Sequence, residues 1–187
     1  MRSVTVDPIF ERVFKKLYGK PCWGVKHIHG SIISLEFGKP HLEIHEPHRA
    51  SRNASRRIRE FFAGRQVYIK GEWTLLIWCC NWEIFRGGRR LGTSRMTASL
   101  ERVSHYLDGQ KLVDFSIEPH QMRSVFKFDL GGKLVTTSFD KSLDLWMVYE
   151  PTGKILTLRG DGMYLYSSSP YTPPNTVPWK PAFLQLK

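Results

Sequence analysis

The sequence predicts an α+β fold made mainly of antiparallel β meanders, with two or three helices on the sheet surface. Short stretches of alternating apolar and polar residues recur between turn dipeptides such as Thr152-Gly153 and Asp161-Gly162, which is typical of hairpins. Two stretches with apolar residues at helical spacing, 8–18 and 97–107, predict helices. A chain of 187 residues can bury a core of its own, so we expect one compact domain over 1–169.

The N-terminal elements follow from capping and alternation. Asp7 is a suitable N-cap for the first helix, Pro8 suits its first turn, and Gly19 ends it. We expect three short strands to follow as a meander, near 22–29, 31–37 and 41–46. In the third of them Leu42 and Ile44 are expected to point inward.

The stretch 67–85, VYIKGEWTLLIWCCNWEIF, is strongly apolar. If it is extended, Trp73 and Leu75 point to one side, while Leu76 and Trp78 point to the other. Because both faces are apolar, we predict a central strand that is buried on both sides and on which the rest of the chain packs.

Most of the excess positive charge lies in one quarter of the sequence. Basic and acidic side chains number seven and five in 1–47, eleven and three in 48–95, and ten and nine in 96–187. The Arg-rich segment 47–65 forms either a short helix, capped by Asn53 and ended by Gly64, or a mobile loop. This distribution indicates a basic patch rather than a uniformly basic particle.

Both halves of the chain show a helix, strands, a glycine turn and a strand that contains tryptophan. Gly38 and Gly131 each follow an apolar–acidic–apolar motif, and Trp73 and Trp146 come after them. The two glycine-to-tryptophan spacings differ by nearly the length of the Arg-rich segment. We therefore expect two pseudo-repeats, 1–92 and 93–169, with 47–65 inserted in the first; a chance likeness of two α+β halves is the alternative.

Five pieces of the chain, which span most of 19–166, carry a resemblance. They are GKPCWGVKHIHGSIISLEFGKPHLEIHEP, RQVYIKGEWTLLIWCC, YLDGQKLVDFSIEP, FKFDLGGKLVTT and LWMVYEPTGKILTLRGDGMY. These pieces are similar to a family of uncharacterised bacterial proteins. The resemblance implies a bacterial origin and a compact domain, and it supplies no activity, ligand or catalytic residue. The Arg-rich segment lies outside it, as does 170–187, which we expect to be a Pro-rich extended tail.

The sequence lacks the motifs of several enzyme classes, of disulfide-rich proteins and of membrane proteins. The sequence has no HExxH or GxSxG motif, and the glycine-rich stretch 86–92 lacks the Lys-Ser/Thr of a phosphate-binding loop, so we expect a non-enzymatic protein without a cofactor. Cys22, Cys79 and Cys80 do not make a disulfide framework, and no run approaches transmembrane length. We expect a cytoplasmic protein that does not bind membranes.

Arginines are the first candidate binding residues, because the guanidinium group forks onto carboxylate and phosphate groups. The candidates are Arg49, Arg52, Arg56, Arg57, Arg59, Arg65, Arg86, Arg89 and Arg90. An acidic protein partner is the leading hypothesis, and nucleic acid is the second. No recognised nucleic-acid-binding motif is present, and a merely solvated basic loop is the alternative to both.

Histidines are the second candidate set. His27 and His29 share one face of a predicted strand, and His41 and His45 share a face of another. Imidazole pairs on adjoining strands can bind zinc or a similar ion, which would make a metal-dependent enzyme the third hypothesis. If a strand lies between the two pairs, however, they are too far apart for one ion, and a solvated polar face is the alternative.

Overall fold

The computed structural model describes residues 4–96, 100–168 and 178–185. Antiparallel strands dominate, with small helices, which confirms the predicted α+β class. Within the described residues no helix is long and apolar enough to cross a membrane. Part of the predicted tail and the predicted start of the second helix lie outside the described residues.

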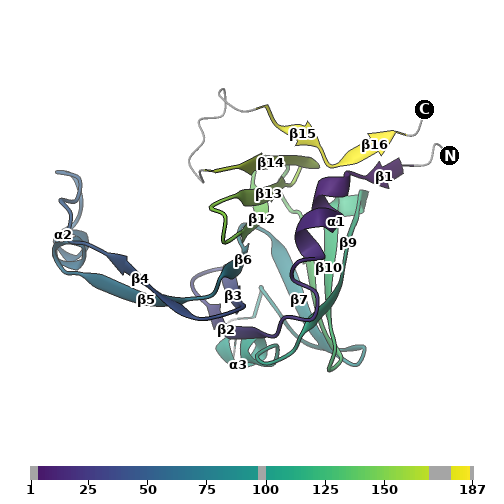
Figure 1. The fold of residues 1–187 in the computed structure, drawn as a ribbon, viewed down its shortest axis with the longest axis horizontal. Coiled ribbons are helices and arrows are strands. Elements are labelled where there is room, and N and C mark those ends of the chain that lie inside the picture. The colour runs from purple at the N-terminus through teal and green to yellow at the C-terminus, as the bar shows by residue number, and fades with distance from the viewer. Residues whose placement is uncertain (1–3, 97–99, 169–177, 186–187) are drawn as a thin grey trace.

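Two antiparallel sheets form the body (Figure 1). The seven-stranded sheet has the order β15 (Lys180–Pro181), β14 (Met163–Ser167), β13 (Ile155–Arg159), β12 (Asp144–Tyr149), β6 (Trp73–Ile77), β3 (Ile33–Phe37) and β2 (Cys22–His27). The five-stranded sheet has the order β8 (Arg89–Thr93), β7 (Asn81–Arg86), β11 (Gly132–Thr137), β10 (Arg123–Phe128) and β9 (Leu112–Glu118). A short helical turn, η1 (His120–Met122), links β9 to β10.

The helix α1 (Pro8–Phe14) helps to fill the space between the sheets. Asp7 caps it as predicted, accepting a hydrogen bond from the Ile9 amide. Phe14 packs on Phe115 of β9 with ring centroids 3.6 Å apart, and on Trp146 of β12 at 5.6 Å. The apolar face of α1 therefore joins the core, while Glu11, Arg12 and Lys15 on its other face are exposed.

The central stretch 67–85 does not form one strand: 67–70 belongs to a separate two-stranded ribbon, and the rest is divided between the two sheets of the body. β6 is an interior strand, and its Trp73, Leu75 and Ile77 are buried against the core. Leu76 on the other face is half-buried, and Trp78 is 38% exposed. The prediction that the strand is buried on both sides is therefore wrong, because only the face of Trp73, Leu75 and Ile77 is fully buried. After residue 80 the chain enters the second sheet as β7, where Trp82 is buried.

Contacts between the two halves are reciprocal. The Gly19 amide donates to the Leu112 carbonyl, and the Gly109 amide donates to the Cys22 carbonyl. In the same way β6 pairs with β12 of the second half, and β11 pairs with β7 of the first half. This exchange of strands favours the two-repeat hypothesis, which stays a prediction.

The register matches different tryptophans from those matched in the sequence. Trp146 pairs with the last residue of β6, Ile77, and Trp82 pairs with Thr136 near the end of β11. Under the two-repeat hypothesis this register makes Trp82, rather than Trp73, the counterpart of Trp146. The insertion would then be the whole stretch between β3 and β6, in place of 47–65, because the connection between β10 and β11 is short.

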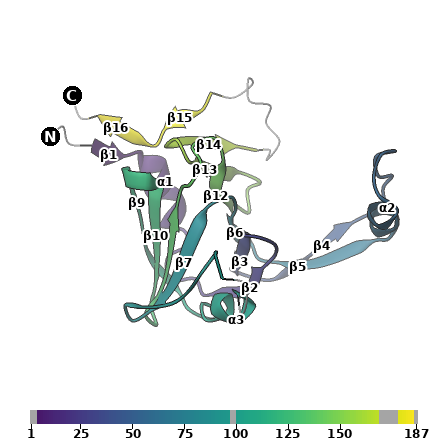
Figure 2. The ribbon, with the colours of Figure 1, turned by 180° about the vertical axis from the view of Figure 1, so that it is seen from behind.

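That inserted stretch forms an arm that projects from the body (Figures 1 and 2). It consists of β4 (His41–His45), α2 (Arg56–Ala63) and β5 (Gln66–Lys70), and β4 pairs with β5 as a separate two-stranded ribbon. The expected meander of 22–29, 31–37 and 41–46 is therefore wrong in its third strand. Leu42 and Ile44, which were expected to point inward, are 62% and 53% exposed.

The chain termini and the second helix complete the fold. β1 (Val4–Val6) pairs with β16 (Phe183–Gln185), which brings the described ends of the chain together. The helix α3 (Leu100–His105) lies against β2 at the base of the arm (Figure 1).

Candidate interaction surface on the arm

The root of the arm is fixed by a buried carboxylate. Glu36 of β3 is 4% exposed and accepts hydrogen bonds from the Gly71 amide at 3.0 Å, the Thr74 hydroxyl at 2.6 Å and the Lys70 ammonium at 3.2 Å. Gly71 must be glycine, because an added Cβ would lie 2.5 Å from the carbonyl oxygen of Phe37. The ribbon therefore leaves the body from a well-anchored hairpin.

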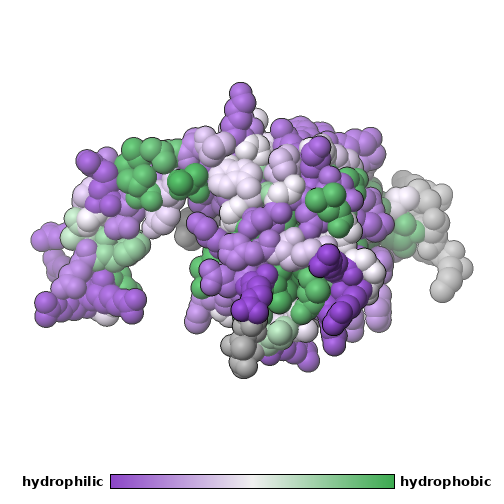
Figure 3. Space-filling view, turned by 90° about the horizontal axis from the view of Figure 1, so that it is seen from below, coloured by the Kyte–Doolittle hydropathy of each residue, from purple (hydrophilic) through white to green (hydrophobic). Residues whose placement is uncertain are grey.

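The ribbon has two chemically different faces. Cross-strand partners Leu42 and Ile69, and Ile44 and Val67, form one aliphatic face, which we call the aliphatic strip. All four side chains are more than half exposed. The opposite face is polar and carries His41, Glu43, His45, Gln66, Tyr68 and Lys70. Figure 3 shows hydrophobic surface on the arm between the body and a hydrophilic end.

The end of the arm is the basic helix α2. Its N-cap is Ser55, whose hydroxyl accepts from the Ile58 amide, so the expected cap Asn53 is wrong while the expected end at Gly64 is right. No residue of α2 is buried. Phe61 is 48% exposed and contacts the ring of Phe62, so the helix offers apolar contact area as well as charge.

Six of the nine candidate arginines lie on this end of the arm, and they differ in their partners. Arg56 pairs with Glu60 at 2.6 Å and Arg65 pairs with Glu46 at 2.9 Å, both as exposed ion pairs. Arg59 donates to the Ala54 carbonyl at 2.7 Å. Within the described parts of the chain, the remaining three have no carboxylate partner; they are Arg49, Arg52 and Arg57. Two of these, Arg49 and Arg52, line a cavity of about 320 Å³ together with Arg59.

The other three candidate arginines belong to a different part of the surface. Arg86 and Arg89 are paired at the end of the β7–β8 hairpin. Arg86 lies over the ring of Tyr106, and Arg90 pairs with Glu83 at 2.7 Å. The structure therefore does not bring all nine arginines into one patch.

The candidate histidines do not form one cluster either. His27 is on β2 and bonds through its Nε2 to the Gly30 carbonyl oxygen, whereas His41 and His45 are on the polar face of the arm. His45 bonds to Glu43 at 2.9 Å. No group of three or more His, Cys, Asp or Glu side chains that could hold a metal ion exists among the described residues.

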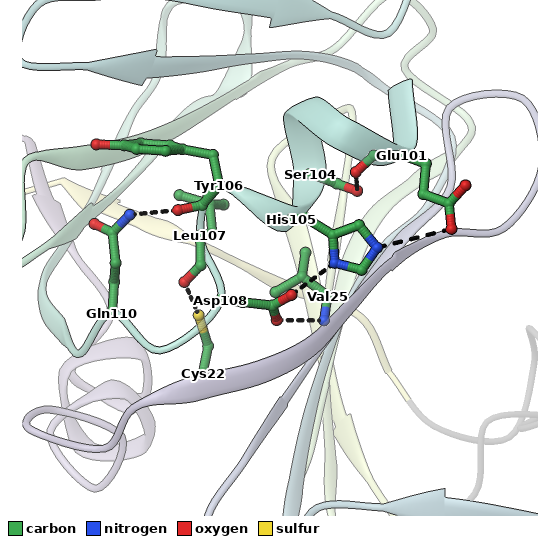
Figure 4. A network of polar contacts seen from close by, with 9 residues as sticks. All are labelled: Cys22, Val25, Glu101, Ser104, His105, Tyr106, Leu107, Asp108 and Gln110. Atoms are coloured by element: carbon green, nitrogen blue, oxygen red, sulfur yellow. Dashed lines mark hydrogen bonds and ion pairs between the residues drawn. The ribbon is translucent and has the colours of Figure 1, made fainter. Parts of the chain in front are cut away.

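A polar network attaches α3 to β2 below the arm (Figure 4). Asp108 accepts from the Val25 amide at 2.8 Å and bonds to His105 at 2.7 Å, and the Cys22 thiol donates to the Leu107 carbonyl. The hydrogen bond to Asp108 raises the pKa of His105. Every one of these groups has a protein partner, so the network serves to hold elements together.

A larger cavity of about 620 Å³ lies between the N-terminal end of α1 and β14. The Tyr164 hydroxyl donates to Asp7 at 3.0 Å and the Tyr166 hydroxyl donates to Glu150 at 2.8 Å. Desolvation raises the pKa of each tyrosine to about 12. Both hydroxyls are therefore engaged as donors to carboxylates, and these bonds join β14 to the start of α1 and to the end of β12.

The aliphatic strip is the part of the surface that sequence reasoning missed. The available signal was that 41–46 and 66–70 flank the Arg-rich segment as a pair of alternating stretches. Comparisons with protein families, with curated proteins and with solved structures each find no match for this chain.

Proposed function

We propose that the chain is a non-enzymatic interaction module that binds an acidic protein partner through the arm. One observation carries the proposal: an exposed aliphatic strip lies on the same projecting element as Arg49, Arg52 and Arg57, which have no carboxylate partner among the described residues. An isolated two-stranded ribbon has little stability of its own in water. Exposed apolar surface rimmed by charge is typical of protein-binding sites. The three free cysteines fit a reducing cytoplasm, where we place the protein.

Nucleic acid is the second candidate for the same surface. Arg49, Arg52 and Arg57 could contact phosphates, and the exposed Phe61 could stack on a base. Phosphate contacts, however, leave the four side chains of the aliphatic strip without a role. A protein partner uses both the charge and the apolar area, and we therefore favour it.

The test compares an arm-less variant with the intact chain. In this variant residues 38–72 are replaced by the connection Asp129-Leu130-Gly131, and Glu36→Gln avoids leaving a buried charge. The probes are a 12-residue peptide that alternates Glu and Leu, polyglutamate, and a 20-nucleotide single-stranded DNA. We expect the alternating peptide to bind the intact chain more tightly than polyglutamate does. We expect the arm-less variant to lose this binding while keeping its cooperative unfolding.

Charge-reversal variants test which arginines contact the peptide. Reversal of Arg49, Arg52 and Arg57 to Glu is expected to weaken peptide binding at least tenfold, because it turns attraction into repulsion. Reversal of Arg89 and Arg90, at the end of the β7–β8 hairpin, is the matched control and is expected to leave binding unchanged. Equal losses in both variants would contradict a site on the arm. Stronger binding of the DNA, with affinity falling steeply as salt rises, would favour nucleic acid instead.

A further inference from the structure

Both outer edges of the arm ribbon are open. β4 and β5 pair with each other, and neither has a second neighbour among the described strands. Open edges present unpaired backbone N–H and C=O groups, onto which an extended segment of another chain can add. The hydrogen bonds of Glu36 fix the root of the ribbon to the body, so the place at which the ribbon leaves the body is defined.

The two edges differ in charge. The stretch 41–46, which contains β4, has Glu43 and Glu46 and no Lys or Arg. The stretch 65–70, which contains β5, has Arg65 and Lys70 and no acidic residue. An acidic segment is therefore repelled along β4 and attracted along β5. Arg65 and Lys70 each have one carboxylate partner already, but Arg65 is exposed and its guanidinium has further donors.

The side chains of β5 also specify a pattern. Val67 and Ile69 lie on the aliphatic strip, whereas Gln66, Tyr68 and Lys70 lie on the polar face. A strand added beside β5 places alternate side chains on the same two faces. Aliphatic residues would then extend the strip beside Val67 and Ile69, and acidic residues would lie beside Lys70.

We propose that the partner contributes an extended segment of alternating aliphatic and acidic residues, which adds to the outer edge of β5 as a third strand of the arm. This inference rests on the proposed function and specifies how the partner binds. A third strand also converts a marginal ribbon into a sheet of the size that is stable in water. The affinity then comes from main-chain hydrogen bonds, and the alternation gives the specificity.

The test uses backbone N-methylation of the alternating Glu-Leu peptide. A strand that adds to one edge points the N–H groups of every second residue at that edge. Two isomers, methylated on all Leu or on all Glu residues, keep the same side chains. We expect one isomer to lose at least tenfold in affinity and the other to stay within about threefold of the parent, with new amide-exchange protection in Gln66–Lys70.

The outcomes separate the two proposals. Equal effects of the two isomers, in either direction, overturn strand addition but leave arm-mediated binding of an acidic peptide intact. Protection of His41–His45 in place of Gln66–Lys70 overturns the choice of edge. Failure of the unmethylated peptide to bind overturns the proposed function and strand addition together. Tighter binding of single-stranded DNA that is lost on reversal of Arg49, Arg52 and Arg57 overturns both in favour of nucleic acid.

Discussion

Replacement of Glu36 by Ala tests whether its carboxylate fixes the root of the arm. The change removes the acceptor for the buried Gly71 amide and for the Thr74 hydroxyl. Each buried donor left without an acceptor costs about 1–3 kcal/mol. The Lys70 side chain is 33% exposed and can turn to water, so its loss adds little. We expect Glu36→Ala to lower the free energy of unfolding by about 2–6 kcal/mol.

Glu36→Gln keeps the shape and one acceptor oxygen, so we expect a loss of about 1 kcal/mol. Glu72→Ala is the matched control, because this carboxylate at the same root accepts a solvent-exposed bond of 3.3 Å from the Lys39 amide. Its expected loss is about 0.5 kcal/mol or less. Urea unfolding followed by tryptophan fluorescence measures all three variants. A Glu36→Ala variant within about 1 kcal/mol of the unchanged chain would refute the assignment of this carboxylate as the anchor.

Three further predictions concern the body. Trp146→Phe removes a hydrogen bond of 3.0 Å to the Ser124 hydroxyl and leaves a cavity, so urea unfolding should show a loss of about 1–3 kcal/mol. The hydrogen bond to Asp108 raises the pKa of His105 in the folded protein. The protonated His105 therefore stabilises the fold fully below the ordinary pKa of histidine, and this stabilisation is lost as the pH rises through the raised pKa. The melting-temperature difference between the unchanged chain and His105→Gln should be larger at about pH 5 than at about pH 9. Iodoacetamide should label Cys79 first, because the other two thiols are buried, and a peptide mass map that shows equal labelling of all three in the native protein would contradict this.

The sequence predicts correctly those helix ends and turns that depend only on neighbouring residues. The cap at Asp7 and the end of α2 at Gly64 follow from side-chain and backbone preferences within a few residues. The hairpin glycines Gly153 and Gly162 have φ of 75° and 81°, a conformation that glycine adopts without strain. The antiparallel α+β class follows from these turns and from the alternating stretches between them.

Alternation could not predict which sheet a strand joins. The alternation of 41–46 indicates a strand whose two faces differ. A strand half-buried in a sheet and a strand of a free ribbon both show this alternation, so it does not distinguish them. Burial of Leu42 and Ile44 would need an opposing layer, and no described segment lies over them. Sequence distance likewise does not predict which arginines lie together, because the structure places Arg86, Arg89 and Arg90 on the body, away from the arm.

The arm is much longer than a connection between two paired strands needs to be. Residues 129–131 suffice to turn the chain between β10 and β11, whereas the arm occupies the corresponding connection between β3 and β6. The register of β3 on β6 is uninterrupted from Phe37↔Trp73 to Ile33↔Ile77, so the pairing of these body strands continues up to the root of the ribbon. The aliphatic strip adds nothing to the core and exposes apolar area to water. Stability of the body therefore does not explain four adjacent aliphatic side chains on the arm, whereas the partner that we propose would cover them.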